Sequence, residues 1–143
     1  MEETEASANV RRLTGESKEM KMENNAIEKE IQAKGLTAPR VTPADIEANI
    51  ESEHYFTASD GVAGSAPGAR PWSVKTGPLS LLTFCVLVLR NGFTVTGESA
   101  CASPENFNAE IGNKIARQNA VAKIWPLMGY ELRSQLNQVE VFP

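Results

Sequence analysis

The feature that most constrains the fold is an apolar stretch, residues 79–89, that leads into Asn91-Gly92 and then into an alternating segment. Both faces of the stretch are apolar, which predicts a central strand covered on both sides. Asn-Gly between two strand-like segments is the strongest short-range signal for a β-hairpin, and it predicts a type I′ turn with positive φ at both residues. Apolar and polar residues alternate along residues 93–100, so the return strand is expected to be half-exposed.

The segment after the hairpin predicts a long helix. Ser103-Pro104-Glu105 combines an N-cap residue, a proline suited to the first helical position and an acid at the positive end of the helix dipole. From residue 107 to 125 apolar residues recur at helical spacing, so one stripe should face the sheet. Pro126 is predicted to end this helix, and residues 129–136 are predicted to form a short second helix.

Upstream, Thr42-Pro43-Ala44-Asp45 has the pattern of a capping box and predicts a second helix start. This helix is expected to end near Glu53, and the aromatic and β-branched residues 54–57 are expected to be extended. Residues 60–78 are rich in glycine and proline and are predicted to be a loop that is either mobile or functional.

The N-terminal part is acidic and weakly patterned. Residues 18–34 favour a helix by composition, whereas residues 1–17 are polar and expected to be disordered. The predicted fold class is therefore α+β: a small antiparallel sheet built on a β-hairpin, then a long C-terminal helix and a short second helix, preceded by a helical, partly disordered segment. The predicted organisation is an N-terminal segment (residues 1–40), a ligand-binding domain (residues 41–136) and a tail (residues 137–143).

Charge and composition exclude several classes of function. The net charge is −4, which argues against a general nucleic-acid binder. Residues 1–53 carry seven Lys/Arg against 12 Asp/Glu, whereas residues 79–136 carry five against four, so the C-terminal part can accept an anion. With two cysteines and one histidine, neither a disulfide framework nor a metal site is expected, and no cofactor is predicted. The longest apolar run is about half of the ~20 residues that a membrane helix needs, which indicates a cytosolic protein without a membrane partner.

The best candidate site lies where the return strand turns into the main helix. Residues 98–103 are small or polar, so backbone amides can approach a ligand closely, and the amides at a helix N-terminus attract phosphate. Asn106 can read the edge of a base or ribose, and Phe107 can stack on a ring. Lys114 and Arg117 can complete an anion pocket, also across a dimer interface. The predicted ligand-binding residues are Ser99, Ser103, Asn106, Phe107, Lys114, Arg117 and Arg90.

Each of these residues also has a purely structural interpretation. The residues after Ser103 make a good helix cap by themselves, Phe107 begins the apolar stripe, and Lys114 and Arg117 can simply be solvated. Catalysis is not predicted. His54 is the only imidazole, and a pair of Cys101 and His54 would lack a recognisable third residue to orient it.

Three motifs carry a resemblance to a known family. The string NGFxVxGESAxxxPENF begins at Asn91, and EIGxKIA and KIWPLxGY follow it. Residues 82–132 resemble small proteins encoded by tailed phages and prophages, and residues 41–58 are similar to the helix and strand that precede this segment in the same family. The layout of this segment also resembles that of the Thoeris anti-defence sponge proteins.

The resemblance implies a function without turnover. The sponge proteins have antiparallel strands followed by paired C-terminal helices, and they form dimers that can assemble further, to hexamers. They sequester glycocyclic ADP-ribose, and some hold cyclic di- or trinucleotides and counter CBASS. A sponge of this kind would work as a homo-oligomer in the cytoplasm of the infected bacterial host, with no DNA partner. The alternative is a phage protein-interaction or structural module without a small-molecule ligand, and an enzyme is ranked last.

Overall fold

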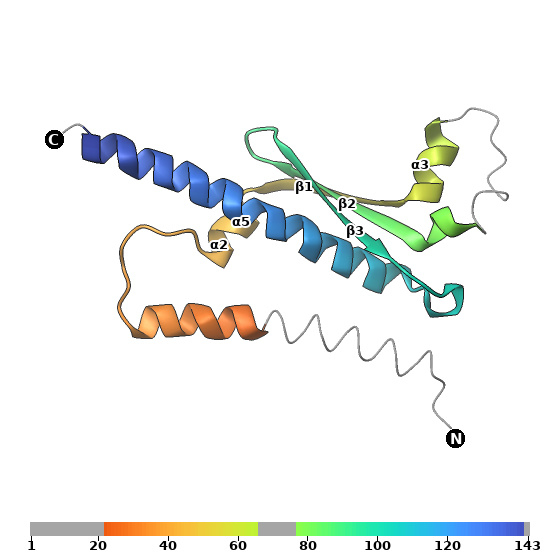
Figure 1. Cartoon of the computed structure of the whole chain (residues 1–143), viewed down its shortest axis with the longest axis horizontal. Helices are drawn as coiled ribbons and strands as arrows, with labels where there is room; N and C mark the ends of the chain where they lie inside the picture. Colours follow the sequence, from red (N-terminus) through yellow and green to blue (C-terminus); the bar gives the residue numbers. More distant parts are fainter. Residues whose placement is uncertain (1–21, 66–76, 142–143) are drawn as a thin grey trace, which may run out of the picture.

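The computed structural model describes residues 22–65 and 77–141, so the disorder expected over residues 1–17 lies outside the described residues. The α+β fold class is confirmed. Three antiparallel strands in the order β1-β2-β3 form one sheet, and a long C-terminal helix crosses one of its faces (Figure 1). The elements are α2 (Pro43–Ala48), β1 (Ile50–Thr57), α3 (Ala58–Ser65), η1 (Pro78–Leu81), β2 (Leu82–Leu89), β3 (Thr94–Ala100), η2 (Pro104–Asn106) and α5 (Ala109–Val141).

The hairpin predicted at Asn91-Gly92 joins β2 to β3, but its turn type is not the predicted one. Gly92 has φ +88°, whereas φ of Asn91 is not positive. The Gly92 amide donates to the carbonyl of Leu89 at 2.9 Å, and the Leu89 amide donates to the carbonyl of Phe93 at 2.8 Å. The connection is therefore a three-residue loop, a type I turn closed by a left-handed glycine, which also matches the twist of the strands.

The core lies between one face of the sheet and α5. Alternate side chains of β2 and β3 point into it, among them Cys85, Leu87 and Val95, and α5 contributes Ala116 and Ile124. Small residues in α5 let its backbone come close to the sheet, so that the helix is held tightly against the hairpin.

The other face of the sheet is less well covered than predicted. β2 is the central strand, as expected, but every second side chain, from Leu82 to Val88, is only half-buried. Phe84 stacks on Phe56 of β1, with ring centroids 5.6 Å apart. Among the described residues, α3 approaches this face only at one end, near Phe56. The prediction that both faces of the central strand are covered is therefore wrong within this part of the chain.

The helix predicted at Thr42 is confirmed, and its boundaries are corrected. Thr42 and Asp45 form the full capping box, but α2 ends at Ala48 instead of near Glu53, and β1 begins at Ile50. The strand expected at residues 54–57 is therefore longer at its N-terminal end.

The start of the predicted loop is helical. Thr57 and Asp60 make the same reciprocal bonds as a capping box, at 3.0 and 3.1 Å, and α3 follows. The prediction of a loop is wrong for residues 60–65. Residues 66–76 of that predicted loop lie outside the described part.

α5 continues through Pro126 to Val141, so the predicted stop and the separate second helix are wrong. Proline removes one backbone donor, which would pair with the carbonyl of Ala122. Ala122 is exposed, so water can satisfy that carbonyl, and the strong helix formers that follow carry the helix on. The helix also takes in residues 137–141 of the expected tail.

The N-terminal segment is helical over residues 22–33, within the range predicted, and it lies beside α5 (Figure 1). Arg40, which lies shortly before α2, donates to Glu28 at 2.8 Å and so ties this helix to the start of the sheet domain. Within the described residues, no helix is both long and apolar enough to cross a bilayer.

Candidate ligand pocket

A pocket of about 310 Å³ opens where β3 leaves the sheet and the chain turns towards α5. It is lined by the junction of η1 and β2, the end of β3, the turn over residues 101–108, and the first two turns of α5. Many of the lining side chains are small, which leaves the space open. The position agrees with the region predicted from the sequence.

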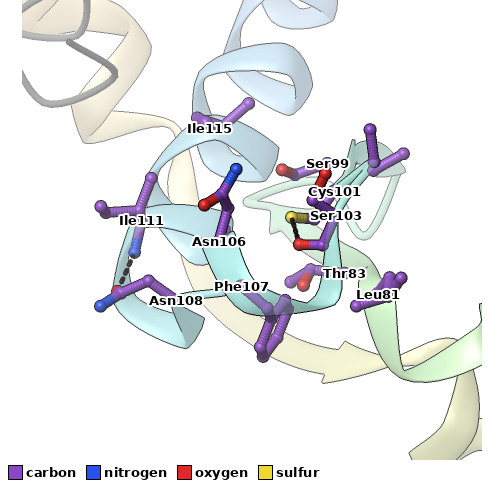
Figure 2. Close-up of a pocket in the computed structure, with 13 residues that line it drawn as sticks. Leu81, Thr83, Ser99, Cys101, Ser103, Asn106, Phe107, Asn108, Ile111 and Ile115 are labelled. Carbon is purple, nitrogen blue, oxygen red and sulfur yellow. Dashed lines mark hydrogen bonds between the residues drawn. The ribbon is translucent and has the colours of Figure 1, made fainter. Parts of the chain in front are cut away.

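The walls differ in character. The strands contribute Thr83 and Ser99, which stand opposite each other in the sheet. α5 contributes the apolar Ile111 and Ile115. Figure 2 shows the carboxamide of Asn106 in the middle of this group, and it makes no hydrogen bond within the described part of the chain. The pocket thus places the side-chain N–H and C=O groups of Asn106 beside an apolar wall.

The prediction that Ser103 caps the main helix is wrong. Residues 104–106 form a single 3₁₀ turn, η2, and the side chain of Ser103 makes no capping hydrogen bond. Phe107 is extended, with φ −63° and ψ 127°, and interrupts the helical backbone. α5 begins at Ala109, and the cap is Asn108, whose side-chain oxygen accepts from the Ile111 amide at 3.0 Å (Figure 2). Asparagine is as good an N-cap as serine, so the later cap is chemically reasonable.

The amides expected to be bare after Ser103 are also occupied. The Asn106 amide donates to the carbonyl of Ser103 at 3.0 Å, and the Phe107 amide donates to that of Pro104 at 3.2 Å. These two donors cannot form a phosphate seat without breaking η2. The polar groups that this pocket offers are therefore mainly side chains such as Asn106.

The structure brings four of the seven predicted residues together. Ser99, Ser103, Asn106 and Phe107 line the pocket. Arg90 lies in the hairpin turn, at the other end of β2. Lys114 is on the exposed side of α5 and forms an ion pair with Glu110 at 3.2 Å.

Arg117 is held elsewhere by two carboxylates. Its guanidinium donates to both oxygens of Glu47, at 2.7 and 3.1 Å, and to Glu53 at 3.0 Å. The two hydrogen bonds to Glu47, and then the one to Glu53, raise the pKa of Arg117 despite its partial burial. Tyr55 donates to Glu53, and burial raises the pKa of Tyr55 to about 12. Arg117 therefore ties α2 and β1 to α5 and does not line the pocket.

One lining residue that the sequence did not indicate is Thr83, which is buried at the pocket floor. Cys101 lies within the predicted region, and its thiol donates to the carbonyl of Ser103 at 3.1 Å (Figure 2). The sequence identifies Thr83 as the neighbour of Ser99 only if the turn type is known, because the turn type sets the register of β2 against β3. Among the described residues there is no group of three metal-ligating side chains.

The fold and the pocket together define a small α+β protein that holds a recessed set of polar and apolar side chains beside the start of its main helix. Compared with known families, residues 41–136 match the phage protein (N4 Gp49/phage Sf6 gene 66) family. This match covers two thirds of the chain, so the protein belongs to that family and is a phage protein. No curated protein and no solved structure matches the chain.

Proposed function

We propose that this phage protein is an anti-defence sponge that binds a cyclic nucleotide immune signal without cleaving it. The first candidate ligand is glycocyclic ADP-ribose, and cyclic di- and trinucleotides come next. Holding the signal in the cytoplasm of the infected host would block Thoeris- or CBASS-type immunity. The observation that supports this proposal is the pocket around Asn106, whose side-chain carboxamide makes no hydrogen bond to any described residue and stands beside an apolar wall.

The pocket chemistry suits a nucleotide. A carboxamide offers two donors and one acceptor, which match the edge of a purine or the hydroxyls of a ribose. The hydroxyls of Ser99 and Ser103 add further polar contacts, and Ile111 and Ile115 can pack against a base. A sponge needs sub-micromolar affinity, roughly −8 kcal/mol or better.

The pocket of one chain is small for such a ligand. Its volume of about 310 Å³ lies at the lower end of the ~300–1,000 Å³ typical of ligand pockets. None of the predicted cations lines it in the described chain, although a diphosphate carries negative charge. The proposed working form is therefore a homo-oligomer, either a dimer or a hexamer, in which a second copy closes the site.

Ligand capture and release test the proposal directly. Purified protein is incubated with glycocyclic ADP-ribose, separated from free ligand and then heat-denatured. A sponge returns the intact ligand, an enzyme returns a product, and a protein without a site removes nothing from solution. Recovery of product, or no depletion at micromolar protein for any cyclic nucleotide of a panel, would overturn the proposal.

Asn106→Ala localises the site. Losing its hydrogen bonds should weaken ligand binding by about tenfold, which is ~1.4 kcal/mol, as measured by titration calorimetry. Asn137→Ala is the matched control, because Asn137 is exposed on α5 far along the chain from the pocket. Equal affinities of the two variants would remove Asn106 from the site.

The second candidate is a protein-interaction or structural module without a small-molecule ligand. The half-exposed apolar face of the sheet, with Phe56 and Phe84 stacked on it, favours this alternative. In that case the panel of cyclic nucleotides leaves the melting temperature unchanged, whereas a sponge is stabilised by its ligand.

A further inference from the structure

A second hollow of the molecule is separate from the pocket around Asn106. It is a groove of about 720 Å³ between α2, the middle of α5 and the N-terminal helix over residues 22–33, which is the orange helix of Figure 1. None of its lining residues also lines the pocket. Its volume lies within the ~300–1,000 Å³ typical of sites for small molecules, so the groove can hold a ligand of its own.

The apolar part of this lining includes an aromatic ring. Ile46 of α2 is 1% exposed, and Val121 and Trp125 of α5 pack half-buried against the same core. Ala122 also lines the groove, and this small, exposed residue takes up little of its space. An indole that is partly held by the core and partly open to the groove offers a surface on which another planar ring can stack.

The polar part of the lining consists largely of uncharged groups without partners. The carboxamides of Asn24, Asn25 and Gln118 make no hydrogen bond to any residue in the described part of the chain, and neither does the indole N–H of Trp125. Each carboxamide offers two donors and one acceptor. Such groups match the edge of a nucleobase, where donors and acceptors also alternate.

The charges of the lining select against an anion. Arg117 is the only cation among the described residues that line the groove, and its guanidinium lies 2.7 Å from a carboxylate oxygen of Glu47 and 3.0 Å from one of Glu53. One positive group is thus surrounded by two negative groups. A phosphate that approached this side of the groove would be repelled, so the ligand that fits best is uncharged.

We propose that this groove binds an uncharged purine nucleoside. The base stacks on the indole of Trp125, and its hydrogen-bonding edge faces the carboxamides of Asn24, Asn25 and Gln118. The absence of a phosphate seat separates this ligand from the anionic cyclic nucleotide that we propose for the pocket around Asn106.

The size of the ligand sets the expected affinity. A nucleoside has about 20 non-hydrogen atoms, and at the binding free energy per atom of drug-sized ligands its Kd is on the order of 10–100 μM. Titration of the full chain with adenosine up to roughly 1 mM therefore covers the range in which the groove fills.

Nuclear magnetic resonance of the labelled full chain tests the site. The protein has two tryptophans, and a Trp72→Phe variant identifies the indole N–H signal of Trp125. This signal should shift on titration with adenosine and reach saturation. Ala122→Leu places a larger side chain in the groove and should raise the Kd at least tenfold. Ala33→Leu is the matched control, because Ala33 is an exposed alanine of the N-terminal helix outside the lining, and its Kd should equal that of the wild type.

A phosphate on the ligand tests the charge argument. Adenosine 5′-monophosphate should bind no more tightly than adenosine. A tenfold gain in affinity from the phosphate, or equal Kd values for Ala122→Leu and the wild type, would overturn the proposal. A Trp125 signal that adenosine leaves unchanged at 1 mM would also overturn it, and that result is expected if the groove holds a peptide segment or a second copy instead.

The outcomes for the two sites are independent. The groove and the pocket share no lining residue, and the groove is tested with an uncharged nucleoside whereas the pocket is tested by capture of a cyclic nucleotide. Failure of adenosine binding leaves the proposed sponge standing, and failure of cyclic nucleotide capture leaves the nucleoside site standing.

Discussion

At the scale of single residues, Gly97 sets how closely α5 approaches the sheet. A Cβ at this position would lie 2.9 Å from the carbonyl carbon of Asn119, and nearer still to backbone atoms of Ala116 and Ala120. Backbone atoms in the middle of a helix cannot move aside separately, so the whole helix would have to shift. We expect Gly97→Ala to lower the free energy of unfolding by about 3 kcal/mol or more, measured by urea denaturation.

The same substitution at Gly129 serves as the control, because nothing lies within 4 Å of a Cβ added there. Gly129 is exposed in the second half of α5, where alanine is the better helix former. Gly129→Ala should therefore raise the free energy of unfolding by up to ~1 kcal/mol. If Gly97→Ala were as harmless as Gly129→Ala, the close packing of α5 on β3 would be incorrect.

Arg117 is the residue for which stability and ligand binding separate most clearly. Arg117→Met would remove the guanidinium that bridges the carboxylates of Glu47 and Glu53. Because the arginine side chain is 29% exposed, solvent screens part of this effect, and we expect a loss of about 1 kcal/mol in thermal or urea unfolding. Ligand affinity in the pocket should stay unchanged.

Lys114→Met is the comparison, since the Lys114–Glu110 pair is largely exposed. Such pairs contribute ~0.5 kcal/mol or less, so this variant should unfold almost like the wild type. A marked drop in ligand affinity for Arg117→Met would return Arg117 to the binding site, where the sequence had placed it.

At the scale of elements, the start of α5 positions the pocket. The cap of α5 is Asn108, whereas Ser103 opens only the short η2 turn. Asn108→Ala should cost about 1 kcal/mol of unfolding free energy, the usual effect of removing an N-cap, whereas Ser103→Ala should change it by much less. Guanidinium denaturation of the two variants measures the difference, and the reverse order of stabilities would restore the cap at Ser103.

Local signals predicted most elements, and the errors arose at their junctions. The capping pattern at Thr42 predicted α2, and the same Thr-x-x-Asp spacing at residues 57–60 went unnoticed among glycines, although it begins α3. Capping strength alone cannot decide between Ser103 and Asn108, because the choice depends on where the apolar stripe of α5 meets the sheet. The prediction that Pro126 ends the helix failed because tertiary packing and flanking helix formers outweigh one missing hydrogen bond.

In the hairpin, the wrong turn type leads to a wrong register along the whole of β3. A two-residue turn at Asn91-Gly92 would pair Arg90 with Phe93 and place Ser99 opposite Phe84. The three-residue loop instead pairs Ser99 with Thr83, on the face that carries the pocket. A shift of one residue moves every side chain of a strand to the other face. The position of the candidate pocket could therefore be predicted from the small residues after β3, but its floor could not.

At the scale of the whole molecule, the family match separates two parts of the chain. It begins at residue 41, so the N-terminal helix over residues 22–33 lies before it. That helix faces α5 across a groove of about 720 Å³ lined by Asn24, Asn25 and Trp125, among others. It also has exposed apolar residues, such as Ile27. We therefore expect its attachment to the rest of the molecule to depend on the pair between Arg40 and Glu28.

The Arg40–Glu28 pair makes the attachment of this helix sensitive to pH. The hydrogen bond from Arg40 lowers the pKa of Glu28 below its ordinary value, and Glu28 raises that of Arg40. A carboxyl whose pKa is lower in the docked state favours docking at pH values above its ordinary pKa, and this contribution is lost as the pH falls through the lowered pKa.

Arg40→Ala should therefore increase amide hydrogen exchange over residues 22–33 at pH 7, while exchange in β2 and the melting temperature stay the same. In the wild type, lowering the pH below the pKa of Glu28 should release the helix in the same way, after correction for the intrinsic exchange rate, whereas in Arg40→Ala the pH should have little further effect. If exchange over residues 22–33 were identical in the two proteins at pH 7, the helix would be held by its contacts with α5 and not by the ion pair.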